Sequence, residues 1–521
     1  MKKKLFTTLA ASIFVALAST AQAEELKIAF ADNVSSLDPQ LNNFAGDRSA
    51  GMFFFNLLVN NYQNKLVPGL ASAWENIDTN TWKVTLRPDI KWSNGEPLTA
   101  EDIIFSIERA RSVPGSVAPF TTYVRTIESV TAQDPQTLIF KTSQPTPDLP
   151  LNLASIYIVN KKAVDGTATE DFNSGKALVG TGPYTLDSYT PGKGFIAKAN
   201  PHYWGEKVLW DKVDYRYTSD AAARTAALLA GDVDVIDKVS FADLKTLQND
   251  QRVNVFTYNG LRVFFLQPSF NPNPSQYITD NAGKPLDKNP LLDVRVRQAL
   301  SLAINREAIV DRILQGGATP TNQWMPEGAV GYNPAVKVAP ADTEKAKALL
   351  AEAGYPEGFQ LTVHVPSDRY PLAPEAIQAV AQFWTRIGIK TNVQVVPWTI
   401  YAGAARKNEY AMSVLGWGNG TGEANYAMVS MLATFNADKG LGAFNWGRYS
   451  SAGLDKFIDQ LGAEFEPTKR EALMREAAQL VADEVGIIPL FHYKDIWAAK
   501  KGLVVKPLSA DRTVPVMVTK E

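Results

Sequence analysis

Helical segments alternate with short apolar strands between residues 342 and 417, and this alternation constrains the fold more than any other feature of the sequence. The first two helices end at Gly354 and Gly388, because glycine readily adopts the left-handed conformation that closes a helix. Such an order requires crossover connections, which are right-handed in nearly all proteins. The sequence therefore predicts an α/β protein with a mostly parallel sheet. The predicted helices are 342–353, 373–387 and 399–407, and the predicted strands are 360–365, 390–396 and 410–417.

Before this region, one long amphipathic helix is predicted over 293–314. Valine, alanine, leucine and isoleucine recur there at helical spacing, and Gly316 and Gly317 follow. The 521 residues are enough for two or three domains. A chain of this length can bury a core that is stable without disulfide bonds, which the absence of cysteine excludes.

The N-terminus has the composition of a secretory signal peptide. Residues 2–4 are lysines, 5–18 are mostly apolar, and 21–23 read Ala-Gln-Ala, a small-residue cleavage site. A membrane anchor is the alternative, but the apolar stretch is shorter than the ~18–20 residues that span a bilayer. We therefore expect cleavage of residues 1–23 and a periplasmic protein. Because no cysteine is present, no lipid anchor is expected.

Composition argues against several classes of function. The formal net charge is −2, which favours neither nucleic acid nor an anionic membrane as a partner. The three histidines, His202, His364 and His492, are far apart in the sequence and are interpreted first as structural residues. The sequence has no H-E-x-x-H, G-x-S-x-G or Walker A pattern. We therefore expect no catalytic site, no metal site and no cofactor.

A glycine-rich stretch follows the last predicted strand. Residues 416–423 read Gly-Trp-Gly-Asn-Gly-Thr-Gly-Glu. Such a loop can present backbone N–H groups to an anion, although alternate glycines do not match a nucleotide fingerprint. It can also be a flexible loop at a sheet edge. We favour a third interpretation, in which the glycines let a ligand's backbone approach and Trp417 provides a flat wall.

Residues 66–109 run from L-V-P-G-L-A-S-A-W-E to W-S-N-G-E-P-L-T-A-E-D-I-I-F-S-I-E-R. This block resembles the signature block of the family 5 extracellular solute-binding proteins, which include the dipeptide and oligopeptide receptors of bacterial ABC importers. Further segments extend the resemblance over nearly all of the mature chain. They are G-T-G-P-Y-T-L at 180–186, N-P-H-Y-W-G at 200–205, G-D-V-D-V at 231–235, the predicted long helix at 293–314 and A-K-A-L-L-A-E-A-G-Y-P-E-G-F at 346–359.

The resemblance implies a two-lobed α/β periplasmic-binding-protein fold, class II-like and of type C, with an additional α/β domain. Lobe I is expected to comprise 24–57, 186–285 and 488–521. The additional domain is expected at 58–185, and lobe II at 286–487. The chain crossings between the lobes are expected to form the hinge of a closing clamp.

The resemblance also implies a monomeric periplasmic receptor. Such a receptor captures small peptides or peptide-like solutes by lobe closure and delivers them to an inner-membrane ABC permease. One alternative keeps this role for a non-peptide solute, such as an opine, a sugar, a glutathione-like compound or a metal chelate. Another is a secreted hydrolase of peptides or glycosides, and the missing nucleophile and metal motifs argue against it.

The glycine-rich loop departs from the peptide-binding pattern at one position. In peptide-binding members, an aspartate three residues after the loop tryptophan pairs with the peptide's α-ammonium group, and here that position is Gly420. Either Glu423 replaces this carboxylate or the ligand has no free α-amine there. Glu423 could also simply begin the next helix. The ligand-binding residues predicted in this loop are Gly416, Trp417, Gly418, Asn419 and Glu423.

Three further ligand-binding residues are predicted outside the loop. Dipeptide receptors have an arginine at the place of Arg369 that holds the ligand's carboxylate, and a planar guanidinium suits this task. The alternative is a surface pair between Arg369 and Asp368, which would contribute little. Phe44, by comparison with the family's lobe I ligand loop, and His492, near the last strand, are the weaker candidates.

Overall fold

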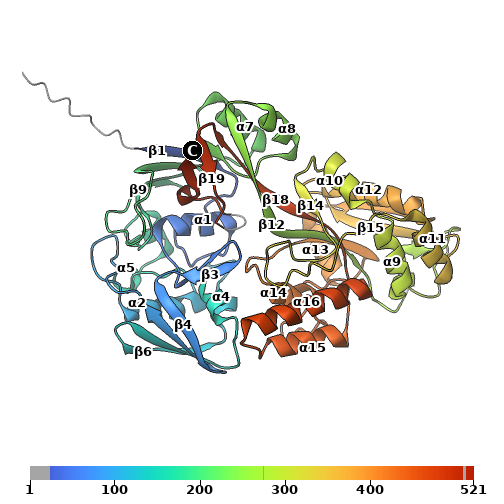
Figure 1. Ribbon diagram of the computed structural model, residues 1–521, viewed down its shortest axis with the longest axis horizontal. Coiled ribbons are helices and arrows are strands. Elements are labelled where there is room, and N and C mark those ends of the chain that lie inside the picture. Colours follow the sequence, from blue (N-terminus) through green and yellow to red (C-terminus); the bar gives the residue numbers. More distant parts are fainter. Residues whose placement is uncertain (1–23, 274, 509–511) are drawn as a thin grey trace, which may run out of the picture.

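Two long strands join the two halves of the protein. The computed structural model describes residues 24–273, 275–508 and 512–521, so the predicted signal peptide at 1–23 lies outside the described residues. The strands β12 (Val253–Pro268) and β18 (Ile488–Lys500) pair antiparallel and run between the halves (Figure 1). They form the middle of one sheet that continues into both halves. The relative position of the halves therefore depends on this strand pair.

The first half contains a mixed sheet built around the first strand of the chain. β1 (Glu25–Phe30) runs parallel to β10 (Lys212–Tyr217) and β11 (Val235–Ile236), and β11 pairs with β18. The antiparallel strands β9 (Gly194–Ala199) and β8 (Tyr184–Thr190) extend the sheet. Aromatic rings fill its core, since the centroids of Phe53, Phe195 and Tyr215 lie 4.9–5.0 Å apart. Its larger helices are α1 (Ala45–Phe54), α7 (Ala221–Ala230) and α8 (Phe241–Asn249).

The second half contains the predicted alternation of strands and helices. β15 (Gln360–Pro366) runs parallel to β16 (Lys390–Val396) and β17 (Met412–Gly418). The helices are α11 (Thr343–Glu352), α12 (Ala373–Thr385) and α13 (Trp398–Arg406). Gly354 and Gly388 have φ angles of 92° and 88°, so both adopt the predicted left-handed conformation. The strands of this α/β region are parallel, as predicted. The large sheet as a whole is not mostly parallel, because β12 and β18 form antiparallel pairs in its middle.

The predicted single helix at 293–314 is wrong, because the chain forms two helices there. They are α9 (Val294–Leu302) and α10 (Arg306–Arg312). The side chain of Asn305 accepts a hydrogen bond from the N–H of Ala308 at 2.8 Å and starts the second helix. The buried Arg306 donates to the carbonyl of Pro489 at 2.8 Å, which ties this break to β18. The periodic apolar pattern thus continues across the break, while the Asn305 cap starts a second helix.

The remaining elements of the second half lie around this core. The 3-10 helix η1 (Pro290–Leu292) precedes α9, and the short strands β13 (Ile278–Thr279) and β14 (Ala318–Pro320) pair with β15 and β18. The segment after β17 forms α14 (Ala424–Ala427) and the π-helical turn η2 (Met428–Leu432). The long helices α15 (Ala452–Leu461) and α16 (Pro467–Glu484) pack on each other.

A separate four-stranded antiparallel sheet forms beside the first half. Its order is β4 (Ala71–Asp78), β5 (Thr81–Leu86), β7 (Thr137–Thr142) and β6 (Ile127–Asp134). Trp82, Val84 and Leu86 alternate with less buried residues along β5 and enter a core of their own. This unit lies within the predicted additional domain. Its other elements are β2 (Val59–Tyr62), β3 (Lys65–Pro68), α2 (Ala100–Arg111), α3 (Thr121–Val124), α4 (Leu149–Leu153), α5 (Lys161–Val164) and α6 (Thr169–Asn173).

The chain ends on the first half. A hairpin of β19 (Leu503–Val505) and β20 (Val518–Lys520) packs there, with the 3-10 helix η3 (Pro515–Met517) between them. Within the described part of the chain, no helix combines the length and the apolar character that a membrane crossing needs.

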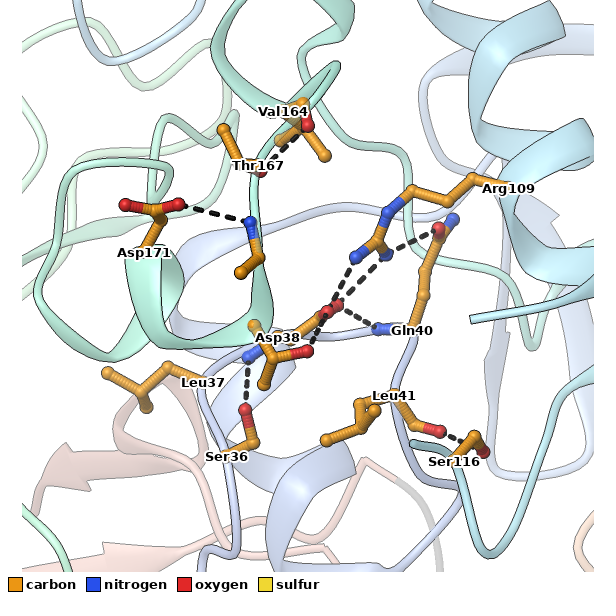
Figure 2. A network of polar contacts seen from close by, with 12 residues as sticks. Ser36, Leu37, Asp38, Gln40, Leu41, Arg109, Ser116, Val164, Thr167 and Asp171 are labelled. Carbon is orange, nitrogen blue, oxygen red and sulfur yellow. Dashed lines mark hydrogen bonds and ion pairs between the residues drawn. The ribbon is translucent and has the colours of Figure 1, made fainter. Parts of the chain in front are cut away.

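A buried ion pair joins α2 to the loop before α1 (Figure 2). Asp38, in the loop before α1, has a fully buried side chain and accepts hydrogen bonds from Arg109 of α2 at 3.0 and 2.5 Å. Arg109 also donates to the side chain of Gln40 at 3.0 Å, and Gln40 donates to the carbonyls of Ser106 and Tyr157. Asp38 and Gln40 are thus both bonded to α2 by Arg109.

The core clusters locate the passage between the halves. Leu261 and Val263 belong to the buried cluster that contains β15 and β17, whereas Val253 and Ile496 belong to a different cluster. The pairing of β12 with β18 shifts register between Asn259 and Val263. This grouping favours a passage of the chain between the halves inside β12 and β18, rather than a boundary between lobes I and II at residues 285/286. The domain ranges given above remain a prediction.

Breaking the Asp38–Arg109 pair should destabilise the protein strongly. Asp38→Asn leaves the Arg109 guanidinium buried without its carboxylate, and we expect a loss of about 3–5 kcal/mol in the free energy of unfolding. Urea denaturation of both proteins measures the difference. Glu75→Gln is the control, because Glu75 pairs with Lys83 at the surface and should change stability little. Equal stability losses in the two variants would contradict this account.

Candidate functional site

A cavity of about 520 Å³ lies between the two halves. One wall comes from the first half and the adjoining hairpin of β2 and β3. The other comes from the loop after β17 and from Leu261 and Arg262 in β12. Its volume is typical of sites for small-molecule ligands. Residues on its walls include Arg48, Met52, Asn60, Asn61, Asn64, Tyr184, Trp210, Arg262, Gly418, Asn419, Gly420, Thr421 and Arg512.

Arg262 is placed against the glycine-rich loop by strand pairing. β12 and β17 run antiparallel with Arg262 opposite Gly418. The Arg262 guanidinium donates to the carbonyl of Gly416 at 3.2 Å. A Cβ atom on Gly418 would lie 2.9 Å from the Nη2 atom of Arg262. Glycine at 418 therefore gives the guanidinium room to lie along the loop.

Asn419 holds the loop in shape from inside. Its side chain is 1% exposed. Its Oδ1 atom accepts hydrogen bonds from the N–H groups of Thr421 and Gly422 at 3.1 and 3.2 Å. Its Nδ2 atom donates to the carbonyl of Glu423 at 2.8 Å. These bonds fix the backbone that faces the cavity.

The hairpin of β2 and β3 contacts the same loop from the opposite side of the cavity. Asn61 donates to the carbonyl of Thr421 at 2.7 Å. Gly422 has a φ angle of 73°, and a Cβ atom there would lie 2.3 Å from the side-chain oxygen of Asn64. The loop and the hairpin tip thus meet at a close approach that requires glycine.

Glu423 is engaged in an ion pair outside the cavity. Its carboxylate accepts a hydrogen bond from Arg470 of α16, and both side chains are largely buried. Burial raises the pKa of the Glu423 carboxyl, and Arg470 opposes this shift. Burial also raises the pKa of Asp148, at the start of α4. Glu423 is not among the residues that line the cavity, so its predicted role in binding an ammonium group remains a prediction.

Arg369 lies at the surface of the second half, in the segment between β15 and α12. Its guanidinium carbon lies 5.2 Å from the ring centre of Trp398. The neighbouring Asp368 accepts a hydrogen bond from the backbone N–H of Trp398 at 2.8 Å. Arg369 is exposed and is not part of the lining of the cavity. The exposed guanidinium therefore lies over the ring of Trp398. Its predicted role in binding a carboxylate remains a prediction.

Trp417 and Gly416 belong to the core of the second half. Trp417 is 9% exposed and packs against the rings of Tyr426 and Phe444, with centroids 5.7 and 4.7 Å away. A Cβ atom on Gly416 would lie 2.5 Å from the ring of Tyr370. Both residues thus pack in the core, and their predicted contact with a ligand remains a prediction.

The two weaker candidates lie in different environments. Phe44, which precedes α1, is 43% exposed. His492 is buried, and burial lowers the pKa of its imidazole to about 4, so the ring is neutral at pH 7. Its Nε2–H group donates to the carbonyl of Trp324 at 3.1 Å. Neither residue lines the cavity.

The remaining buried histidine is packed against an aromatic ring. His364 is buried against the ring of Tyr410 at a centroid distance of 3.8 Å, and burial lowers its pKa to about 4. Among the described residues, no three histidine, aspartate or glutamate side chains gather closely enough to hold a metal ion. The residues that line the cavity offer hydrogen bonds, charge and apolar contact to a solute.

Of the predicted ligand-binding residues, Gly418 and Asn419 line the cavity, and most of the other lining residues were not predicted from the sequence. Arg262 interrupts the apolar run 261–266, and a charged residue within such a run can indicate a functional position. The stretch 60–64 contains three asparagines, and Gln63 and Asn64 adopt positive φ angles of 50° and 64°. Arg48 and Arg512 carried no comparable signal, because only the fold brings them to the cavity.

Comparison with known proteins gives consistent results. The sequence profile described as bacterial extracellular solute-binding proteins, family 5 middle, matches residues 65–439. The dipeptide-binding protein of Escherichia coli strain K12 is 27% identical over 477 residues, covering 85% of this chain and 84% of that protein. The glutathione-binding protein GsiB of Shigella flexneri serotype 5b is 28% identical over 495 residues, covering 92% of this chain and 91% of that protein.

Solved structures show the same fold. HbpA2 from Haemophilus parasuis superposes with a TM-score of 0.82 at 25% identity, covering 95% of this chain and all of that chain. The unliganded open form of the murein tripeptide-binding protein MppA superposes with a TM-score of 0.80 at 23% identity, covering 96% and 98% of the two chains. The predicted two-lobed α/β binding-protein fold is therefore confirmed.

Gly422→Ala should destabilise the loop and its contact with the hairpin. Alanine in the left-handed conformation, together with displacement of Asn64, should lower the free energy of unfolding by about 1–2 kcal/mol. Gly420→Ala is the matched control, because a Cβ atom at 420 meets no atom within 4 Å. Thermal unfolding of both variants checks the difference, and a Gly420→Ala loss equal to that of Gly422→Ala would count against the close approach.

Proposed function

Because the chain belongs to the bacterial extracellular solute-binding proteins of family 5, we propose that it is the periplasmic receptor of an ABC importer for a small peptide or peptide-like solute. The observation that carries this proposal is the cavity of about 520 Å³ whose walls come from both halves. A solute in it contacts the glycine-rich loop on one side and the asparagine-rich hairpin on the other. Such a solute binds the closed arrangement of the halves more strongly than an open one.

Closure follows from this difference in affinity. A ligand shifts the equilibrium between open and closed forms only by its preference for one of them. Contacts made by both halves at once exist only in the closed form. The loop after β17 supplies backbone groups, Arg369 supplies a guanidinium for a carboxylate, and ordered water can fill the space around variable side chains.

The named relatives support a peptide-like solute. The relatives from E. coli and S. flexneri bind a dipeptide and glutathione, according to their names. The alternative of a non-peptide solute is favoured by one feature of this chain. Gly420 carries no carboxylate, and Glu423 is paired with Arg470, so the loop offers no acid to a free α-ammonium group.

Export, delivery to the permease and the absence of catalysis complete the proposed role. We propose that residues 1–23 direct export and are removed, that no lipid is attached, and that the protein delivers its solute to the permease as a monomer. The members of the family are solute-binding proteins rather than enzymes. We propose that this chain likewise makes and breaks no bond in its solute and uses no cofactor.

The direct test combines identification of the natural solute with a binding screen. Mass spectrometry of the protein purified under native conditions should find a small solute, and a library of di- and tripeptides should raise the melting temperature. The same peptides should be recovered uncleaved after incubation. Turnover would overturn the receptor function, whereas stabilisation by non-peptide solutes alone would exclude the peptide assignment.

Arg369→Ala should weaken the binding of a solute that carries a carboxylate. The guanidinium can engage both carboxylate oxygens, so we expect a loss in affinity of about tenfold or more, measured by isothermal titration calorimetry. Arg386→Ala is the matched control, because Arg386 is exposed and also stacks on an aromatic ring, that of Phe383 at 5.5 Å. An unchanged dissociation constant in Arg369→Ala would remove this residue from the site.

A further inference from the structure

A second cavity, of about 280 Å³, lies within the second half of the protein. Its walls include residues of α9, α11 and α16, the first residue of α10, the segment 322–324 and the start of β18. None of the residues that line it also lines the cavity between the halves. The two cavities are therefore separate, and the second one does not belong to the proposed receptor site.

The wall of this cavity contains a buried cation, Arg306, which is 4% exposed. Its guanidinium donates to the carbonyl of Pro489 at 2.8 Å and to the carbonyl and hydroxyl oxygens of Ser301 at 3.0 and 2.8 Å. These bonds use three of the five N–H groups of a guanidinium, so two remain for further acceptors. Burial lowers the pKa of Arg306 to about 10, and no neighbouring charge contributes to this shift. The group is therefore charged at pH 7, and its bonded partners are all neutral.

The lining of the cavity includes a second cation and no acid. Lys345, exposed in the first turn of α11, lines it, and no aspartate or glutamate is among the described lining residues. The acids close to these cations in sequence lie outside the lining. Asp342 caps α11 by accepting a hydrogen bond from the N–H of Lys345 at 2.9 Å, and Glu307 is exposed. Glu484, at the end of α16, accepts a hydrogen bond from the hydroxyl of Tyr449. An anion in the cavity would thus meet two cations and no lining carboxylate.

An indole N–H group on the same wall lacks an acceptor. Trp324 is 2% exposed, and its Nε1 atom is buried with no hydrogen-bond partner among the described residues. The carbonyl of Trp324 accepts a hydrogen bond from His492 at 3.1 Å, which holds this backbone against β18. Buried polar groups in folded proteins nearly always have partners. Since the side chains of arginine and tryptophan carry donors only, both residues suit a ligand that supplies acceptor oxygens.

Much of the remaining wall is apolar. It includes Leu302, Leu349, Val481, Val485 and Ile487. The volume lies near the lower end of the range for small-molecule sites, so a ligand that fits is small. Apolar side chains gain free energy when an apolar group replaces water against them. The wall therefore combines donors and positive charge with a surface for an apolar body.

We propose that this cavity is a second binding site, for a small carboxylate with an apolar body, whose charged end lies against Arg306 and Lys345. Hydrogen bonds between a guanidinium and a carboxylate are charge-assisted and stronger than those between neutral groups. The ligand supplies the counterion that the lining lacks, and a buried charge is costly without one. The inference goes beyond the proposed receptor function and does not depend on it.

Calorimetric titration of the protein with benzoate, hexanoate, benzamide, hexylamine and inorganic phosphate tests the ligand class. Benzoate and hexanoate should each bind about tenfold or more tightly than benzamide, the uncharged analogue of benzoate. Hexylamine, which carries the opposite charge, should bind most weakly. Inorganic phosphate has the charge without the apolar body and should bind more weakly than either carboxylate. Benzamide binding as tightly as benzoate, phosphate binding more tightly than both carboxylates, or no binding of either carboxylate would overturn the proposal.

Variants locate the site. Ala482 lines the cavity and is half-buried, so Ala482→Leu should fill part of the cavity and weaken benzoate binding about tenfold or more. Arg306→Gln should remove most of the preference for benzoate over benzamide. Lys345→Gln should weaken benzoate binding about threefold, because an exposed charge contributes less. Lys347→Gln is the matched control, because Lys347 lies on the same helix, pairs with Glu344 at 3.1 Å and does not line the cavity.

Melting temperatures verify that each variant is folded. Lys345→Gln keeps the test decisive if the two buried-site variants are unstable, because Lys345 is exposed. A benzoate affinity that is the same in every folded variant as in the unaltered protein would place the benzoate site elsewhere and overturn the proposal. A loss in Lys347→Gln equal to that in Lys345→Gln would also overturn it, since surface charge in general would then explain both. The peptide screen tests the receptor function separately, so the two failures can be told apart.

Discussion

The antiparallel pairing of β12 with β18 is the constraint on which the rest of the structure depends. The ladder runs from Val253 opposite Lys500 to Leu266 opposite Ile488, and breaks only between Asn259 and Val263 and at Phe264/Phe265. At the first break, a Cβ atom on Gly260 would lie 2.3 Å from the carbonyl of Tyr493, so the two backbones approach closely there. A continuous ladder resists sliding, whereas an interruption concentrates bending. The cavity wall begins at this point, so bending there changes the cavity directly.

The contacts near this strand pair differ in strength. The Asp38–Arg109 pair is buried and fully bonded, so separating the additional domain from the first half would expose an uncompensated charge. Across the cavity, Asn61 of the hairpin donates to the carbonyl of Thr421, and Trp82 meets Phe465 at a ring distance of 6.0 Å. Asp148 also interacts with Arg470 on this side. A typical hydrogen bond contributes about 1 kcal/mol net. The Asn61–Thr421 hydrogen bond is therefore weaker than the buried Asp38–Arg109 pair.

Charged residues lie on both sides of the loop after β17. Carboxylates that border the loop, Glu423 and Asp148, are drawn towards Arg470 at the junction, where burial raises their pKa values. The cavity keeps the guanidinium of Arg262 along the loop backbone because Gly418 leaves space for it. The loop thus lies between the Glu423–Arg470 pair and the cavity wall that contains Arg262.

The sequence by itself determined the local elements and the family. Helix-closing glycines at 354 and 388 set the α/β rhythm of the second half, because left-handed closure is a local property. Tertiary structure alone decided the rest. The antiparallel crossing strands, the bond from Arg306 to Pro489 at the break in a predicted helix, and the meeting of three arginines at the cavity join residues far apart in the chain. Local periodicity carries no record of such neighbours, so only packing decides which side chains face the cavity and which, like Trp417, enter the core.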